Sequence, residues 1–197
     1  MYTGVIKTTG QITQVDRYPS GSRIRVEAAN PGLDPEDSIS VSGVCLTAES
    51  VDSDGFDTFL SSETVARTYL ADLPSGSGVN IERPLQLEDR FDGHMVKGSV
   101  DTVTEVVDIE QLGDDWRFTF AAPEEYQQYL VEKGAVSIDG ISLTVSGISD
   151  GTFSVAVVPT TYELTTLSEK GIGDSVHFEA DVLAKYVERQ RDLPSCG

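Results

Sequence analysis

The sequence contains an internal repeat, and this repeat constrains the fold more than any other feature. Blocks of the first half recur in the same order in the second half, first 94 and then 97 positions later. The clearest matching pairs are residues 1–6 with 95–100, 23–26 with 117–120, 40–47 with 137–144, and 79–82 with 176–179. The change of spacing places three extra residues in the second copy. The chain therefore consists of two copies of one module of roughly 90 residues, followed by a tail.

Each module has the pattern of short β-strands. Four runs alternate or are rich in β-forming residues: 23–27, 38–41, 117–120 and 136–138. Gly55 and the pair Asp150 and Gly151 occupy hairpin-turn positions between such runs. Many short strands separated by turn signals predict a small closed barrel in each copy.

Two segments have helical patterns. Residues 123–133 begin with a proline and precede Gly134, which predicts a helix in the second copy only. Residues 181–193 predict a C-terminal helix with a stripe formed by Val182, Leu183, Tyr186, Val187 and Gln190. This helix either packs on its own barrel or associates with copies of itself.

Acidic residues dominate the charge of the chain. There are 33 Asp and Glu residues against 14 Lys and Arg, which gives a net charge of −19. Such a chain lacks the basic face that binds nucleic acid or an anionic membrane, so we expect neither partner. The acidity is spread along the chain, which favours a host with high internal salt, where charge repulsion is screened. An ordinary acidic protein is the alternative.

Several other classes of protein are disfavoured. The chain has no run of 18 apolar residues, and its first ten residues lack an apolar leader core, so we expect a cytoplasmic protein. Cys45 and Cys196 do not suggest a disulfide framework, and no Cys, His or Asp cluster has metal-ligand spacing. We therefore expect no bound metal.

The matched segments carry small polar side chains at equivalent positions. Cys45 and Thr47 in the first copy correspond to Ser142 and Thr144 in the second, and in a strand each pair shares one face. Two equivalent polar faces indicate two binding sites for a polar heterocycle, one in each copy of the module. The alternative is that these residues only satisfy turns and barrel ends. Gly4 and Gly98 precede the strand-like runs, where they would let a flat ligand approach the backbone.

Five motifs, in order, resemble those of one enzyme family. They are residues 1–6 (MYTGVI), 42–48 (SGVCLTA), 93–98 (GHMVKG), 139–145 (DGISLTV) and 165–167 (TTL). From Met1 to about Arg191 the chain resembles riboflavin synthase of the alpha-chain type. The resemblance implies an all-β fold with two tandem six-stranded Greek-key β-barrels, residues 1–90 and 91–181. It also implies a C-terminal helix within residues 182–197 that associates three chains.

The resemblance further implies a reaction. The family converts two molecules of 6,7-dimethyl-8-ribityllumazine into riboflavin and 5-amino-6-ribitylamino-2,4-pyrimidinedione by moving a four-carbon unit, with no metal or coenzyme. One lumazine lies in the N-terminal barrel of one chain and the other in the C-terminal barrel of a neighbour. The implied partners are therefore two lumazine molecules and further copies of the chain in a homotrimer.

Carried onto this sequence, the resemblance assigns two ligand sites and a set of active polar residues. The N-terminal site would use Gly4, Val5, Ile6, Cys45, Leu46, Thr47, Ser61, Ser62, Glu63 and Thr64. The C-terminal site would use Gly98, Ser99, Val100, Lys133, Ser142, Leu143, Thr144, Val157, Val158, Pro159, Thr160, Thr161 and Tyr162. The positions linked to activity are Ser38, Cys45, Lys133, Asp139, Ser142 and Asp181.

Ser99 departs from the family pattern, which has a histidine at this position. Serine forms hydrogen bonds but does not titrate near neutral pH, so the change bears on rate more than on binding. His94 keeps the family's first histidine, and we expect it to be structural. Cys45 either assists proton transfer or ring addition, or it forms a small apolar wall of the pocket.

A binding protein of the same family is the alternative function. Such proteins keep the N-terminal site, lose the second site and do not turn over substrate. Lys133, Asp139, Ser142 and Thr144 are all present in the second copy, which favours two working sites and hence catalysis. Ser99, which replaces the family's histidine, favours the binding protein instead.

Overall fold

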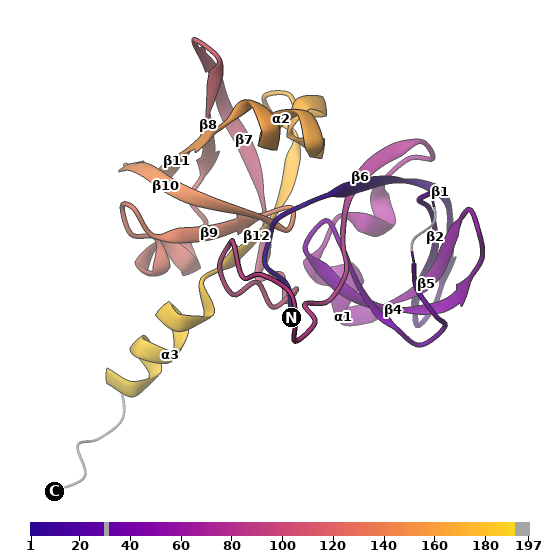
Figure 1. The fold of residues 1–197 in the computed structure, drawn as a ribbon. Coiled ribbons are helices and arrows are strands. Elements are labelled where there is room, and N and C mark those ends of the chain that lie inside the picture. The colour runs from indigo at the N-terminus through magenta and orange to yellow at the C-terminus, as the bar shows by residue number, and fades with distance from the viewer. Residues whose placement is uncertain (30–31, 192–197) are drawn as a thin grey trace, which may run out of the picture.

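The computed structural model describes residues 1–29 and 32–191, which form two β-barrels side by side (Figure 1). The first barrel closes in the strand order β1-β2-β5-β4-β3-β6. Its strands are β1 (Thr8–Tyr18), β2 (Gly21–Glu27), β3 (Ser38–Val41), β4 (Val44–Val51), β5 (Gly55–Ser61) and β6 (Ser77–Glu82). The short helix α1 (Ser62–Arg67) and the 3-10 turn η1 (Leu70–Asp72) connect β5 to β6.

The second barrel repeats the first. Its strands are β7 (Thr102–Leu112), β8 (Asp115–Ala121), β9 (Ala135–Ile138), β10 (Ile141–Ser149), β11 (Thr152–Val157) and β12 (Ser175–Ala180). They close in the equivalent order, and α2 (Pro159–Leu164) and η3 (Thr166–Glu169) lie where α1 and η1 lie in the first barrel. Bulges also recur, at Ile12/Gln14 and Val106/Asp108 and at Ala48/Ser50 and Val145/Gly147. The prediction of two barrels with one topology is confirmed.

Along each strand the side chains are alternately buried and exposed, which is the pattern expected of a barrel strand. In β4, Val44, Leu46 and Ala48 point into the barrel, while Cys45 and Thr47 lie on its exposed face. The same alternation in the other strands gives each barrel its own apolar core. Burial of these side chains stabilises each closed barrel, which has no free sheet edge.

Residues at the start of each module pack against the other barrel. Ile6 belongs to the core of the second barrel, and Val100 packs against the core of the first. The two segments cross where the backbone of Tyr2 pairs with that of Val96. Each barrel is therefore completed by a short arm from the opposite half of the chain.

A buried polar cluster joins the two barrels. Asp139, 1% exposed, accepts hydrogen bonds from the Tyr69 hydroxyl and the His177 amide, each at 2.7 Å. The Nδ1 of His177 lies 2.7 Å from the Ser42 carbonyl, and its Nε2 accepts the Tyr69 amide at 3.1 Å. Burial lowers the pKa of His177 and raises that of Tyr69, so both are neutral at neutral pH. Lys170 lies 3.2 Å from Asp139 and balances the buried carboxylate.

The two helix predictions have different outcomes. Residues 123–133 do not form the predicted helix: only a 3-10 segment, η2 (Glu124–Tyr129), is present. The chain then turns through Lys133, at φ +67°, to enter β9 at Ala135, which leaves no room for further helical turns. The C-terminal helix α3 (Val182–Arg191) is present, and residues 192 and 193 of the prediction lie outside the described residues.

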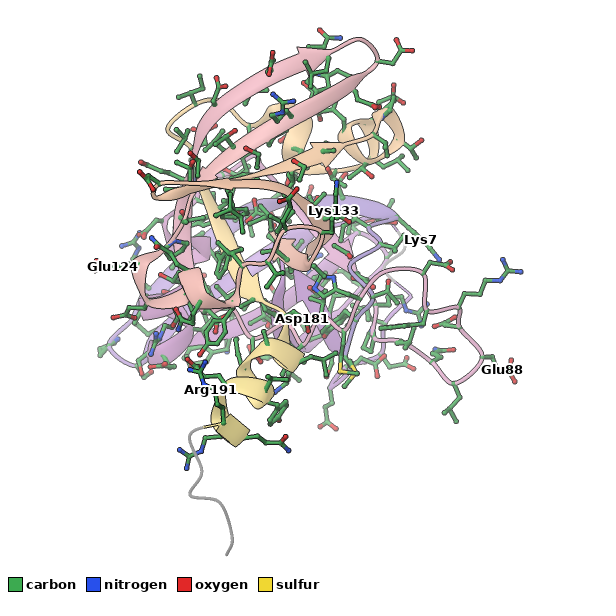
Figure 2. All side chains as sticks on the ribbon, turned by 90° about the vertical axis from the view of Figure 1, so that its left-hand side faces the viewer. Lys7, Glu88, Glu124, Lys133, Asp181 and Arg191 are labelled. Atoms are coloured by element: carbon green, nitrogen blue, oxygen red, sulfur yellow. The ribbon has the colours of Figure 1, made fainter. Side chains whose placement is uncertain are left out.

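Helix α3 projects from the second barrel, with Asp181 at its base and Arg191 at its far end (Figure 2). Lys185 forms an ion pair with Asp101 at 2.5 Å, and the Tyr129 hydroxyl donates to Glu188, so polar contacts fix the helix on the second barrel. Its apolar stripe is not covered, since Leu183, Tyr186 and Val187 are 58%, 63% and 69% exposed. Within the described residues no helix is both long and apolar enough to cross a membrane.

Candidate active site

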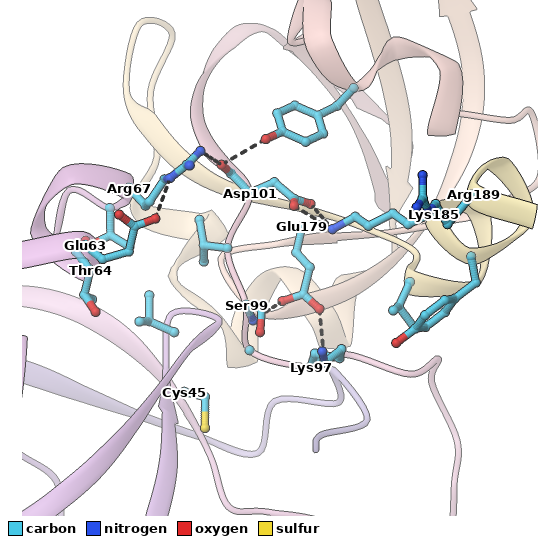
Figure 3. A pocket seen from close by; sticks show the side chains of 17 residues that line it. Cys45, Glu63, Thr64, Arg67, Lys97, Ser99, Asp101, Glu179, Lys185 and Arg189 are labelled. Carbon is cyan, nitrogen blue, oxygen red and sulfur yellow. Dashed lines mark hydrogen bonds and ion pairs between the residues drawn. The ribbon is translucent and has the colours of Figure 1, made fainter. Parts of the chain in front are cut away.

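A cavity of about 660 Å³ lies between the first barrel, the arm around Gly98 and helix α3 (Figure 3). Its lining residues come from six parts of the chain: Val44, Cys45, Glu63, Thr64, Arg67, Thr68, Lys97, Gly98, Ser99, Val100, Asp101, Tyr126, Glu179, Val182, Lys185, Tyr186 and Arg189. Its volume lies in the range of pockets that take small organic ligands. Six predicted site residues line this cavity: Cys45, Glu63, Thr64, Gly98, Ser99 and Val100.

Cys45 lies on the exposed face of β4 and faces this cavity. The hydroxyl of Tyr2 donates a hydrogen bond to its Sγ at 3.1 Å. Tyr2 is fully buried, and burial raises its pKa far above the usual value, so the hydroxyl remains a donor. Thr47 follows on the same face of β4, and its cross-strand neighbour on β3 is Ser38, which is exposed. Cys45, Thr47 and Ser38 therefore form one polar edge.

The arms do not belong to the sites that the sequence analysis assigned to them. The Cys45 amide donates to the Gly98 carbonyl at 2.8 Å, and a Cβ on Gly98 would lie 2.7 Å from the Cys45 Cβ. In the same way the Ser142 amide donates to Gly4 at 2.8 Å, and a Cβ on Gly4 would lie 2.6 Å from the Ser142 Cβ. Both glycines, at φ +75°, allow this close contact between the halves of the chain.

The assignment of the arms is therefore corrected. Gly98, Ser99 and Val100 cap the N-terminal site beside Cys45, whereas Gly4, Val5 and Ile6 cap the C-terminal site beside Ser142. Repeat matching shows which residues are equivalent, but it does not show on which copy each residue packs.

Two glutamates hold the arms in place, of which Glu82 is half-buried and Glu179 is buried. Glu82 accepts the amides of Thr3 and Gly4 at 2.7 and 3.0 Å, and its equivalent Glu179 accepts those of Lys97 and Ser99 at 2.6 and 2.8 Å. Burial raises the pKa of both carboxyls, although the amide donors act in the opposite direction. The two glutamates occupy matching positions in the repeat, but the sequence pattern alone does not indicate their role.

The C-terminal site repeats the polar edge. Ser142 and Thr144 share one face of β10, and Lys133 donates its amide to the Val145 carbonyl at 2.8 Å, so its backbone lies beside this edge. The Lys133 side chain is exposed (Figure 2). The Nδ1 of His94 lies 2.7 Å from the Ser142 Oγ, and burial lowers the His94 pKa, so the ring is neutral at neutral pH. Contact with a predicted site residue makes His94 a candidate functional residue, beyond the structural role expected for it.

Other predicted residues lie farther from these edges. Leu46 and Leu143 point into the barrel cores, and Asp139 lies in the interface between the barrels. Asp181 Oδ1 accepts the Leu183 amide at 2.9 Å and caps the start of α3.

Two further stretches predicted to line the ligand sites, residues 61–64 and 157–162, lie at the starts of α1 and α2. Ser61 caps α1 by accepting the Thr64 amide at 3.2 Å, and Ser62 is exposed at its first turn. Val157, Val158, Pro159, Thr160, Thr161 and Tyr162 run from the end of β11 into α2. Tyr162 stacks on Trp116, with ring centroids 3.8 Å apart.

Comparison with known proteins places these features in one family. A family model described as the lumazine binding domain matches twice, over residues 3–84 and 97–181. The division at residues 90 and 91 remains a prediction. The described arms begin near the starts of both matches, at Thr3 and Lys97.

Curated relatives match the sequence of this chain over nearly its whole length. Riboflavin synthase of Mycobacterium bovis is 40% identical and covers 96% of this chain and 97% of its own length. The riboflavin synthases of Brucella abortus and Actinobacillus pleuropneumoniae are 38% and 37% identical, each over 96% of this chain. Those two matches cover 97% and 89% of the relatives' lengths.

Solved structures share the fold at lower identity. LumP complexed with riboflavin superposes with a TM-score of 0.85 at 18% identity, covering 91% of this chain and 99% of LumP. LumP complexed with 6,7-dimethyl-8-(1'-D-ribityl) lumazine gives a TM-score of 0.83 with the same coverage. On the family model and the curated relatives together, the chain belongs to the riboflavin synthase family and contains two lumazine-binding domains.

Proposed function

We propose that this chain converts two molecules of 6,7-dimethyl-8-ribityllumazine into riboflavin and 5-amino-6-ribitylamino-2,4-pyrimidinedione. The duplicated polar edge is the observation that carries this proposal. Cys45 and Thr47, capped by the Gly98 arm, recur as Ser142 and Thr144, capped by the Gly4 arm. A reaction between two identical molecules needs two such sites.

The proposed chemistry depends mainly on placement. Holding two reacting rings face to face can lower the barrier by ~7–11 kcal/mol. Hydroxyl and amide donors along each edge stabilise charge that develops on ring oxygens and nitrogens. No metal or coenzyme is required for this four-carbon transfer.

His94 and Cys45 are the proposed groups for proton movement. His94 is neutral and hydrogen-bonded to Ser142, so it can orient the serine hydroxyl and exchange a proton through it. The Cys45 Sγ accepts a hydrogen bond from the Tyr2 hydroxyl, and this donor would stabilise negative charge on the sulfur in the transition state. Ser99 lies at the first site, so its lack of a titrating ring affects that site and not the second.

We further propose that three chains assemble through α3, with the N-terminal site of one chain facing the C-terminal site of a neighbour. The uncovered stripe of Leu183, Tyr186 and Val187 supports this assembly, because an exposed apolar helix face favours association. Light scattering coupled to size-exclusion chromatography measures the number of chains. A wild-type protein that stays monomeric at high concentration in molar salt contradicts the trimer.

The test of the activity is incubation with 6,7-dimethyl-8-ribityllumazine in molar salt. Riboflavin is expected to appear at half the rate at which the lumazine disappears. The Ser142→Ala variant is expected to bind lumazine at the first site but to form riboflavin much more slowly. Tight binding of lumazine without any product refutes the enzyme and leaves the alternative, a lumazine- or flavin-binding protein with one working site per chain.

A further inference from the structure

Two residues other than glycine have a left-handed backbone at equivalent places in the two barrels. Glu36 precedes β3 at φ +76°, and Lys133 precedes β9 at φ +67°. They are 97 positions apart, which is the spacing of the repeat in this region. The left-handed region favours glycine, because the Cβ of any other residue crowds the backbone there. A charged side chain at this position in both copies indicates a role beyond the local fold.

The two loops share one backbone geometry. The Glu36 amide donates to the Ala48 carbonyl, and the Lys133 amide donates to the Val145 carbonyl, each at 2.8 Å. The amides of Ala48 and Val145 donate in return to the carbonyls of the residues after Glu36 and Lys133, each at 2.9 Å. Ala48 and Val145 directly follow the threonines of the two polar edges, on β4 and β10. Each left-handed residue therefore lies beside one of the two polar edges.

The two side chains are exposed and opposite in charge. Within residues 1–29 and 32–191, neither the Glu36 carboxylate nor the Lys133 ammonium group has a hydrogen bond or an ion pair. Among the neighbouring charges, Asp37 accepts the Asp34 amide at 2.9 Å, and Glu132 precedes Lys133. The first loop is thus strongly acidic, and the equivalent loop of the second barrel presents a cation.

Opposite charges at equivalent positions distinguish between the ways in which two chains can meet. Two edges of the same fold that face each other are related by an approximate two-fold axis, and residues near that axis meet their equivalents. When the first barrel of one chain meets the second barrel of another, Glu36 lies opposite Lys133. Contact between two first barrels would oppose Glu36 with Glu36, and contact between two second barrels would oppose Lys133 with Lys133. Like charges repel, so only the unlike contact is favoured.

We propose that Glu36 of one chain forms an ion pair with Lys133 of a neighbouring chain, and that this pair selects contact between unlike barrels. The inference rests on the proposed function, in which the N-terminal site of one chain faces the C-terminal site of the next. Unlike contact places the Cys45 edge opposite the Ser142 edge. Like contact would instead join two copies of the same edge. The ion pair therefore determines which two sites face each other.

The test reverses the two charges singly and together. Analytical ultracentrifugation measures the association of the intact protein at one salt concentration at which the wild type is assembled. Glu36→Lys and Lys133→Glu each place like charges opposite each other, so the concentration for half-assembly should rise about tenfold. The double variant Glu36→Lys/Lys133→Glu restores opposite charges in exchanged places and should return to within about twofold of the wild type. No variant introduces or removes a glycine, so the left-handed backbone costs much the same in all of them.

Asp114→Lys is the matched control for net charge. Asp114 is exposed in the turn between β7 and β8, and its replacement changes the charge of the chain by the same amount as Glu36→Lys. Because the chain has a charge of −19, loss of negative charge alone should leave assembly unchanged or tighter. Weaker association of Glu36→Lys beside unchanged association of Asp114→Lys therefore isolates the position of the charge from its amount.

Two results overturn the inference. They are unchanged association of Glu36→Lys, and a double variant that associates as weakly as the single variants. Riboflavin formation is measured on the wild type and Glu36→Lys in parallel. Wild-type assembly and product formation in Glu36→Lys refute the ion pair and leave the proposed function intact. A wild-type trimer that forms no riboflavin refutes the proposed reaction, while the charge reversals still decide the ion pair by association alone. A wild type that stays monomeric refutes the ion pair and the proposed assembly together.

Discussion

Replacing Gly98 by alanine tests the arm that completes the first site. Gly98 adopts φ +75°, and an L-residue in this left-handed region costs about 1–2 kcal/mol. The added Cβ would lie 2.7 Å from the Cys45 Cβ and 2.9 Å from the Cys45 nitrogen, so the backbone must move. Overpacking of this kind costs about 1–3 kcal/mol. Loss of the hydrogen bond from the Cys45 amide to the Gly98 carbonyl costs about 1 kcal/mol more. We expect a total loss of about 3–6 kcal/mol.

Gly113→Ala is the matched control. Gly113 has nearly the same backbone conformation, φ +69°, but a Cβ there meets nothing within 4 Å. It should lose only the cost of the left-handed backbone, about 1–2 kcal/mol. Urea unfolding followed by circular dichroism measures both free energies of unfolding. Equal losses in the two variants would refute the reasoning, because they would show that the Gly98 arm does not press on β4.

Three further predictions concern other parts of the structure. In a Cys196→Ser background, Tyr2→Phe removes the hydrogen-bond donor to the Cys45 Sγ, so we expect slower alkylation of Cys45 by iodoacetamide at a fixed pH, because the reacting sulfur loses a donor that stabilises negative charge; identical alkylation rates would contradict the hydrogen bond. Because burial lowers the pKa of His177, the stability that it contributes is complete above its unfolded pKa of about 6.5 and is lost as the pH falls through the folded pKa. The free energy of unfolding should therefore fall more steeply from pH 7 to pH 5 in the wild type than in His177→Gln, and equal slopes would exclude this group. At about 0.01 M salt the Debye length is roughly 30 Å, so chains of charge −19 should separate and lose activity together. A stable, active trimer at that salt concentration would refute the argument from charge.

The repeat made the barrel architecture predictable. Residues 38–41 were predicted as a strand and form β3 with the same limits, and Asp150 and Gly151 form the expected turn between β10 and β11. Local sequence is sufficient here because side-chain alternation and turn residues act over only a few positions.

Packing between the halves was not predictable in the same way. The prediction of a helix at residues 123–133 was wrong because the 3-10 segment η2 ends at Tyr129 and the chain then turns through Lys133, at φ +67°, to enter β9. The arms were assigned to the wrong sites because the equivalence of Gly4 and Gly98 says nothing about their neighbours in space. Tyr2 and His94 belonged to recognised motifs, but only their contacts with Cys45 and Ser142 show what they do.

The exchange of arms also describes how such a chain could arise. A single module could not cap its own polar edge with its own arm in the geometry seen here. It would have to lend its arm to a second copy and receive that copy's arm in return. The tandem chain thus has the form of a domain-swapped dimer whose two members have been joined into one polypeptide. Since each half holds the other's arm, mutations around Gly4 or Gly98 act on a site in the opposite half of the gene.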